Sequence, residues 1–410
     1  MLISYNITNN KEEFLNYEGP KLNYSDKRLK DELFIQAHSL LFELNYYFIE
    51  ITYHHFYDFH GLFLSSSDAD LPFDPFAASF YLVTRYEEIT DDVKDQHDRF
   101  LPSHSIASKY NFLDEPVIDQ WAFLIKKKIL EKYPNTNFKE RNFQFISTLD
   151  VDQAFAFKNR EAFRIIGSFI RCLIQLDFYE ISRQISVYTG SSKDPFDTFD
   201  YIEDIHRKYD LTPIIFILFG RYGKYDKNIP TSNQEFKELI RYMSQYAEIG
   251  LHPSYTSNFD FLLLKEEMKK LAVVSNKWIK TNRQHYLKLS IPDTYYNLIK
   301  IGITTDYSMG YARAAGFRAG TCTPFNFFDI KKNMELDIKV FPFHIMDRAL
   351  QKYLNMQPKE ALQKIEKIVN NVKKVNGTFV SLWHNDALSN YREYKGWRNI
   401  YKRMFEIVFS

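Results

Sequence analysis

Short apolar runs alternate with longer amphipathic segments over the second two thirds of the chain. The amphipathic segments 261–280 and 358–375 have apolar residues at helical spacing. Short apolar runs separated by such helices favour strands that pair in parallel, as in a (β/α) barrel or an open sheet. The predicted strands are residues 143–149, 214–219, 248–251, 286–289, 338–341 and 378–383.

The first third of the chain has a different rhythm. Residues 48–59 and 61–66 are typical of strands, 73–89 of a helix with Pro75 near its first turn, and 117–132 of a second helix. The polar stretch 132–142, "KYPNTNFKERN", follows that helix and is the best candidate for a domain boundary. We therefore predict a small α/β domain over 1–140 and a (β/α) barrel over 141–410.

The composition is typical of a folded chain of this size and argues against some classes of binding partner. The 410 residues are 45% hydrophobic and 17% aromatic, which is enough for a sizeable core and argues against disorder. A net charge of +1 gives no general attraction to nucleic acid. The first residues lack the pattern of a secretory signal, and charged residues interrupt the most apolar stretch, so we expect a cytoplasmic protein without a membrane span.

Polar side chains follow several of the predicted strands, where chemistry is usually placed in parallel α/β folds. Asp150 and Asp152 follow the strand in "FQFISTLDVDQAFAF", His252 follows the strand in "EIGLHPSYTSN", and His384 follows the strand in "GTFVSLWHNDALS". Taken singly, each has an ordinary alternative: an aspartate that forms a turn, or a structural histidine. Arg283, in "TNRQHYLKLS", taken alone resembles a solvated charge.

Taken together, these residues predict a metal site. Carboxylates and imidazoles at several strand ends are the ligands that zinc or a similar ion prefers, and such an ion lowers the pKa of water towards about 7. Two aspartates one residue apart repel each other unless a positive charge compensates them. One of Asp150 and Asp152 is then free to bind the metal and the other to accept a proton.

With these motifs the chain resembles the polysaccharide deacetylases of carbohydrate esterase family four, which have a distorted (β/α) barrel. "STLDVD" is similar to the first family motif, "LHPSYTS" to the second, "RQHY" to the third and "SLWHN" to the last. The resemblance implies that Asp150 is the general base and Asp152 and His252 are metal ligands. It also implies that Arg283 orients the base and His384 is the general acid. The implied activity is metal-dependent removal of acetyl groups from an N-acetylated sugar or polysaccharide, with zinc as the expected metal and cobalt or nickel as alternatives.

One position departs from the family pattern. The second motif is normally His-x-x-x-His, but its second position here is Thr256, a poor zinc ligand. His285 lies two residues from Arg283, so in an extended segment both point to one face, and we predict that His285 supplies the missing nitrogen. Two other hypotheses stay open. One is an inactive barrel that binds glycan or a partner protein, and the other is an amidase acting on a non-sugar substrate such as a ureide.

Overall fold

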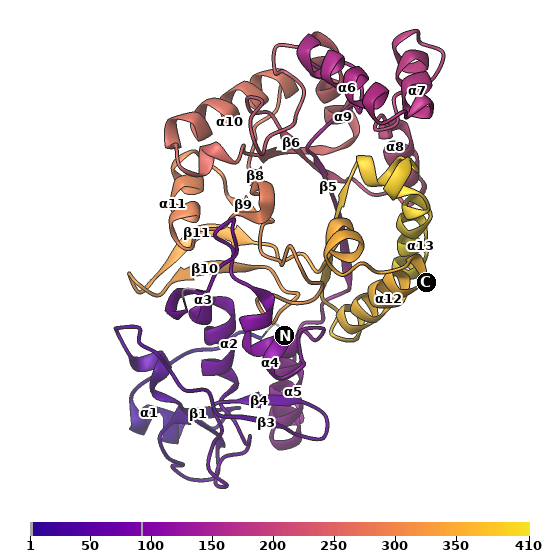
Figure 1. Cartoon of the computed structure of the whole chain (residues 1–410). Helices are drawn as coiled ribbons and strands as arrows, with labels where there is room; N and C mark the ends of the chain where they lie inside the picture. The colour runs from indigo at the N-terminus through magenta and orange to yellow at the C-terminus, as the bar shows by residue number, and fades with distance from the viewer. Residues whose placement is uncertain (1–2, 92) are drawn as a thin grey trace.

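The computed structural model describes residues 3–91 and 93–410 and is dominated by one mixed sheet. Its nine strands follow the spatial order β10-β11-β9-β8-β7-β6-β5-β13-β12, and every neighbouring pair is parallel except β10 and β11. In Figure 1 these strands curve around a common centre, with most helices outside them. The strands are β5 (Gln144–Val151), β6 (Ile214–Leu218), β7 (Glu248–His252), β8 (Thr281–Asn282), β9 (Thr305–Asp306), β10 (Phe325–Asp329), β11 (Met334–Val340), β12 (Ile345–Met346) and β13 (Thr378–His384).

The central strands are apolar on both faces because each face packs on a different cluster. Along β6, Ile215 and Ile217 point into the large core between the sheet and the outer helices. Their neighbours Ile214 and Phe216 point the other way, into a smaller inner cluster with residues of β13. The outer helices are α8 (Phe199–Lys208), α9 (Gln234–Tyr246), α10 (Phe261–Ser275), α11 (Asp293–Lys300), α12 (Pro358–Lys374) and α13 (Trp397–Phe409).

A separate core lies in the first third of the chain, and Figure 1 places this part below the large sheet. Trp121 and Phe73 are fully buried there, and the indole N–H of Trp121 donates to the carbonyl of His60 at 2.7 Å. The elements are α1 (Lys11–Asn16), β1 (Leu22–Ser25), β2 (Leu33–Gln36), β3 (Tyr53–His55), β4 (His60–Leu62), α2 (Pro75–Val83), α3 (Tyr86–Thr90), α4 (Ile106–Lys109) and α5 (Val117–Lys132).

Most predicted elements of the sheet are confirmed, with small shifts at their ends. The predicted strand 286–289 is wrong, because the strand at this place is the shorter β8, which begins five residues earlier. Tyr286 and Leu287 both have positive φ and lie in a tight turn, which ends the extended segment before the apolar residues begin. The predicted helix 73–89 is split into α2 and α3 at Arg85, which has φ +55°. The predicted strands 48–59 and 61–66 shorten to the hairpin β3–β4.

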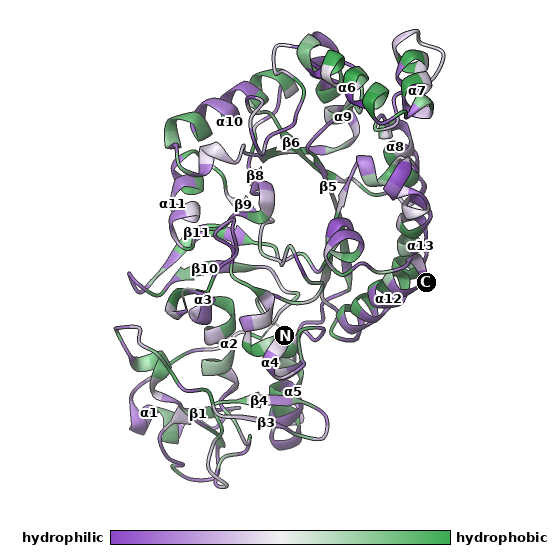
Figure 2. Cartoon of the chain, in the orientation of Figure 1, coloured by the Kyte–Doolittle hydropathy of each residue, from purple (hydrophilic) through white to green (hydrophobic). Residues whose placement is uncertain are grey.

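A short helical hairpin is inserted between β5 and α8. It consists of α6 (Ala162–Ile174) and α7 (Phe178–Tyr188), joined by a turn at Leu176. Both helices lie at the periphery in Figure 1, and Figure 2 shows many apolar residues on α6. Among the described residues, no helix combines the length and the hydropathy that crossing a membrane requires.

Candidate metal centre

All six predicted site residues lie at one edge of the sheet. Parallel pairing in the order β8-β7-β6-β5-β13 places the carboxyl ends of these strands along one edge, and His384 is in register with Asp150 on the adjacent strand. The side chains line a common cavity of about 420 Å³, a volume typical of small-molecule sites. Residues there include Asp150, Asp152, His252, His285 and His384, while Arg283 lies buried directly behind Asp150.

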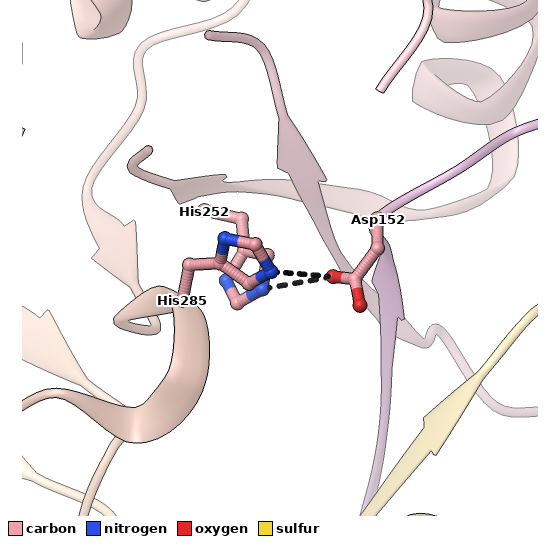
Figure 3. Close-up of side chains that lie close together, drawn as sticks. All are labelled: Asp152, His252 and His285. Carbon is pink, nitrogen blue, oxygen red and sulfur yellow. Dashed lines mark ion pairs between the residues drawn. The ribbon is translucent and has the colours of Figure 1, made fainter. Parts of the chain in front are cut away.

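Three side chains converge as the ligands of a metal ion do. The Nε2 atoms of His252 and His285 lie 3.2 Å and 3.7 Å from Oδ1 of Asp152, as Figure 3 shows. All three ligand atoms lie within 4.8 Å of one another. Ligand atoms around a tetrahedral zinc ion, with bonds of about 2.0–2.1 Å, are separated by about 3.3 Å, so the spacing suits such an ion.

Hydrogen bonds behind the two imidazoles fix which nitrogen faces the cavity. Nδ1 of His252 lies 2.6 Å from the carbonyl oxygen of Arg283, which only accepts, so Nδ1 carries the proton. Nδ1 of His285 lies 2.9 Å from Oδ1 of Asp226 and donates to it in the same way. Both Nε2 atoms therefore face Asp152, and each can offer its lone pair to a metal once it is deprotonated. Partners behind metal-binding histidines typically fix ring orientation in this manner.

The carboxylate of Asp152 provides an independent sign that the cluster is built for a cation. Its Oδ1 is buried and accepts no hydrogen bond from any described residue. Burial opposes ionisation of this group, but the nearby imidazoles of His285, His252 and His384 outweigh burial and hold the pKa of Asp152 well below its usual range. An ionised oxygen without a hydrogen-bond donor in a buried site is costly unless a cation occupies the space in front of it.

Asp150 is held apart from this cluster by Arg283. The Arg283 guanidinium is fully buried, and its Nη1 donates to Oδ1 of Asp150 at 2.9 Å. Its Nε donates to the carbonyl of Tyr307 at 3.0 Å, and it lies over the ring of Phe216 at 4.5 Å. These contacts fix the guanidinium in one place. The second oxygen of Asp150 lies 3.8 Å from Nε2 of His252 and is directed toward the cluster.

His384, the neighbour of Asp150 on the adjacent strand β13, also faces Asp152. Its Nε2 is 3.7 Å from Oδ2 of Asp152, and its Nδ1 donates to Oδ1 of Asp347 at 2.7 Å. Oδ2 of Asp347 also accepts the His384 backbone N–H at 2.8 Å. Burial and Arg348 oppose protonation, but the charges of Asp347 and Asp152 outweigh them and raise the pKa of His384. The structure thus places a protonatable imidazole and a carboxylate on adjacent strands next to Asp152.

A segment from the first third of the chain closes one wall of the cavity. Arg99 lies in that wall, pairs with Asp95 at 2.7 Å, and donates from Nη1 to the carbonyl of Tyr286 at 2.8 Å. Tyr286 and Leu287 have φ of 60° and 53°, a conformation that is uncommon for non-glycine residues. The bond from Arg99 therefore helps to hold the turn that follows His285.

Three polar residues of this site are absent from the sequence prediction: Asp226, Asp347 and Arg348. Asp347 directly follows the short strand β12, so its position after "HIM" is the same kind of signal that identifies Asp150. Asp226 lies in an irregular loop after β6, where the sequence carries no comparable signal. Thr256 lies in a turn next to Ser254, 3.3 Å between their hydroxyl oxygens, and is not one of the three converging ligands.

Comparisons with known proteins give a family match and several similar structures. Residues 1–134 match the model of DUF7033, a family of unknown function, and no curated protein sequence matches the chain. Similar solved structures include a Mycobacterium smegmatis protein assigned as a polysaccharide deacetylase, 14% identical over 67% of this chain and 86% of that one, with a TM-score of 0.43.

Two further structures come from Bacillus species. A polysaccharide deacetylase of Bacillus cereus is 12% identical over 65% of this chain and 88% of that one, with a TM-score of 0.32. A CE4 family pseudoenzyme of Bacillus anthracis is 12% identical over 65% of this chain and 61% of that one, with a TM-score of 0.30. The similar structures thus include both a deacetylase and a pseudoenzyme. The function of this chain is accordingly argued from its own site.

Proposed function

We propose that residues 141–410 form a distorted (β/α) barrel of the polysaccharide deacetylase type, which removes acetyl groups from an N-acetylated sugar or glycan. The observation that carries the proposal is one cavity in which Asp152, His252 and His285 converge next to a carboxylate, Asp150, and an imidazole, His384. Hydrolysis of an amide needs both partners, since the attacking water must lose a proton and the departing amine must gain one.

The three converging residues are the proposed ligands of a divalent metal, most simply zinc, with cobalt or nickel as alternatives. The unpartnered oxygen of Asp152 and the two imidazoles locked with Nε2 inward fit such an ion. When bound, an ion of this type acts as a Lewis acid and lowers the pKa of water. His285 then fills the place that a second histidine at Thr256 would have filled.

The remaining polar residues have separate tasks in this proposal. Asp150 takes the proton of the attacking water, and Arg283 holds Asp150 in place through the 2.9 Å bond. His384, kept protonated by Asp347, gives a proton to the leaving nitrogen. The aromatic lining of the cavity, which includes Phe196, offers flat apolar faces of the kind on which sugar rings pack.

One observation favours an inactive glycan-binding protein instead. Nη2 of Arg348 lies 3.5 Å from Oδ2 of Asp152, so a positive charge partly compensates this carboxylate without any metal. Near-stoichiometric zinc, cobalt or nickel in purified protein, with acetate released from acetylated chito-oligosaccharides, supports the deacetylase. Protein without tightly bound metal, inactive after addition of each of the three ions, overturns it. Bound metal without acetate release would overturn the sugar substrate and would favour an amidase that acts on a non-sugar amide.

We expect Asp226→Asn to weaken metal binding without removing any proposed ligand. The carboxylate of Asp226 accepts a hydrogen bond from Nδ1 of His285 at 2.9 Å, and loss of its charge weakens the bond that orients this ring. Such substitutions behind a ligand typically cost about 10–100-fold in metal affinity. Competition with a metal chelator at fixed pH measures the change. Asp337→Asn, on a side chain outside the cavity, is the control, and equal affinities in the two variants would contradict the prediction.

A further inference from the structure

The α6–α7 hairpin has its apolar residues on the outside. Along α6, Phe163, Ile166, Ile170 and Ile174 recur at helical spacing and so share one face, with exposed fractions between 52% and 77%. The residues of α6 that are buried are small, Ser168 and Cys172. The orientation is the reverse of an ordinary surface helix, whose apolar face packs on the core.

Helix α7 shows the same reversal. It buries Glu180 and Gln184 together with one apolar residue, Val187, and exposes Phe178 and Tyr179. Together with Leu176 in the turn, these side chains extend the exposed face of α6 into one apolar surface. We call the set Phe163, Ile166, Ile170, Ile174, Leu176 and Phe178 the hairpin surface. Scattered exposed apolar residues are normal in soluble proteins, but a contiguous surface of this kind marks an interaction site.

Polar contacts on the inner side hold the hairpin in this orientation. Glu180 forms an ion pair with Nη2 of Arg392 at 3.1 Å, and the same nitrogen donates to Oδ2 of Asp177 at 2.7 Å. On α6, Arg164 donates to the carbonyls of Lys227 and Asn228 at 3.1 Å and 3.2 Å. Turning the apolar face inward would break these bonds and bury charge, so the exposed arrangement is the stable one.

The charges around the hairpin surface select its partner. Helix α6 contains Arg164 and Arg171 and no acidic residue. Residues 158–183 contain five basic and three acidic residues. Two of the acidic residues are paired with Arg392, Lys158 is paired with Glu235, and Arg171 is exposed. Anionic phospholipid headgroups complement this cationic margin, while Phe, Ile and Leu side chains fit the boundary with the acyl chains. A symmetric contact between two copies would instead bring like charges together.

We propose that the α6–α7 hairpin docks the protein on the surface of a membrane that contains anionic phospholipid. The helices are too short to span a bilayer, so the contact is interfacial. The hairpin also adjoins the cavity: Gln153 precedes it, Phe196 follows it, and both line the cavity together with Lys227. Docking through this surface brings the cavity close to the lipid. The proposal goes beyond the deacetylase function and does not depend on it.

Co-sedimentation with vesicles tests the docking proposal directly. The intact chain should bind vesicles of phosphatidylglycerol and phosphatidylcholine more strongly than vesicles of phosphatidylcholine alone, and added salt should weaken the binding. The variant Ile166→Glu/Ile170→Glu should reduce the bound fraction at low lipid at least about tenfold. Both side chains are more than half exposed, so the fold should persist, and thermal unfolding of the variant checks this.

A matched variant and a second measurement make the test decisive. Leu262→Glu/Val273→Glu replaces two even more exposed apolar residues on α10 and should leave vesicle binding unchanged. Equal loss in both double variants, or no binding to anionic vesicles, overturns the proposal. Sedimentation velocity without lipid tests whether a second copy of the chain occupies the hairpin surface instead. A dimer that dissociates in the Ile166→Glu/Ile170→Glu variant would show that a second copy covers this surface and would also overturn the docking proposal.

Discussion

Replacing Asp150 by asparagine is expected to lower deacetylation about 10²–10⁴-fold while the bound metal is retained. The loss follows from the proposed role of Asp150, because an amide does not accept a proton from the attacking water. The asparagine side chain would still present an oxygen to Nη1 of Arg283, which now donates to Oδ1 of Asp150 at 2.9 Å, so the site should keep its shape. Steady-state kinetics with an acetylated chito-oligosaccharide, together with metal analysis of the same sample, measures both quantities.

Asp152→Asn is the informative comparison for this variant. The oxygen Oδ1 of Asp152 faces both Nε2 atoms, so substitution of Asp152 should remove metal and activity together, whereas substitution of Asp150 removes only activity. If Asp150→Asn kept activity within about tenfold of the unmodified protein, the base would have to be another group. Loss of metal from Asp150→Asn would make Asp150 a ligand and would exchange the proposed roles of the two aspartates.

The sequence was sufficient for the strands that form the site because these strands are short, apolar and followed at once by polar residues. Strand β5 contains Asp150 next to its last residue and leads into Asp152, and β13 ends in His384, so pattern and position agree. The sequence pattern was misleading at β8, because the apolar residues that suggested a strand come after the actual strand. The direction of the chain there depends on a turn at Tyr286 and on its bond to Arg99, a contact between residues 187 positions apart.

The site residues divide in the same way. The predicted positions of Asp150, Asp152, His252, Arg283, His285 and His384 at one edge of the sheet agree with the structure, whereas their roles stay predictions. Asp226 was missed because only the tertiary structure brings its loop, which follows β6, next to the site. There its Oδ1 accepts from Nδ1 of His285 and from the backbone N–H of Tyr255.

The α6–α7 hairpin illustrates a different limit of sequence patterns. The apolar residues of α6 recur at helical spacing, and this spacing is the same whether the face meets a protein core or a lipid surface. Only the packing shows that Ser168 and Cys172 are inside and that Ile170 and Ile174 are outside. Periodicity thus indicates an apolar face, and the tertiary structure decides what that face can contact.

Acidification is expected to destabilise the fold through two buried neutral histidines outside the site. Burial lowers the pKa of His206 to about 4 and the pKa of His344 to about 3, from 6.5. His206 donates from Nδ1 to the carbonyl of Ile202 at 2.6 Å and accepts at Nε2 from the hydroxyl of Ser147 at 2.8 Å. Nδ1 of His344 accepts the backbone N–H of Val380 at 3.2 Å. A proton on the accepting nitrogen would break either bond.

The direction and the size of this destabilisation follow from how many protons the folded and the unfolded chain bind. Below pH 6.5 the unfolded chain binds a proton at each histidine that the folded chain does not, so the free energy of unfolding falls as the pH falls. A pH of 5 lies about 1.5 units below the imidazole pKa of the unfolded chain. At about 1.36 kcal/mol per unit, the free energy of unfolding therefore falls by about 2 kcal/mol for each of the two histidines. This is a large share of the stability of about 5–15 kcal/mol that is typical of a domain.

Urea unfolding at pH 7 and pH 5 measures the effect when each variant is compared with the unmodified protein. The comparison is needed because His252 and His384, whose pKa values are raised by neighbouring carboxylates against the effect of burial, gain stability on acidification and offset the total. In the unmodified protein the two histidines lower the free energy of unfolding between pH 7 and pH 5. In each of the variants His344→Gln and His206→Gln this decrease should be smaller by about 2 kcal/mol. His54→Gln, on an exposed side chain, should leave the decrease unchanged, and parallel pH profiles for all four proteins would show that neither buried histidine is neutral because of its burial.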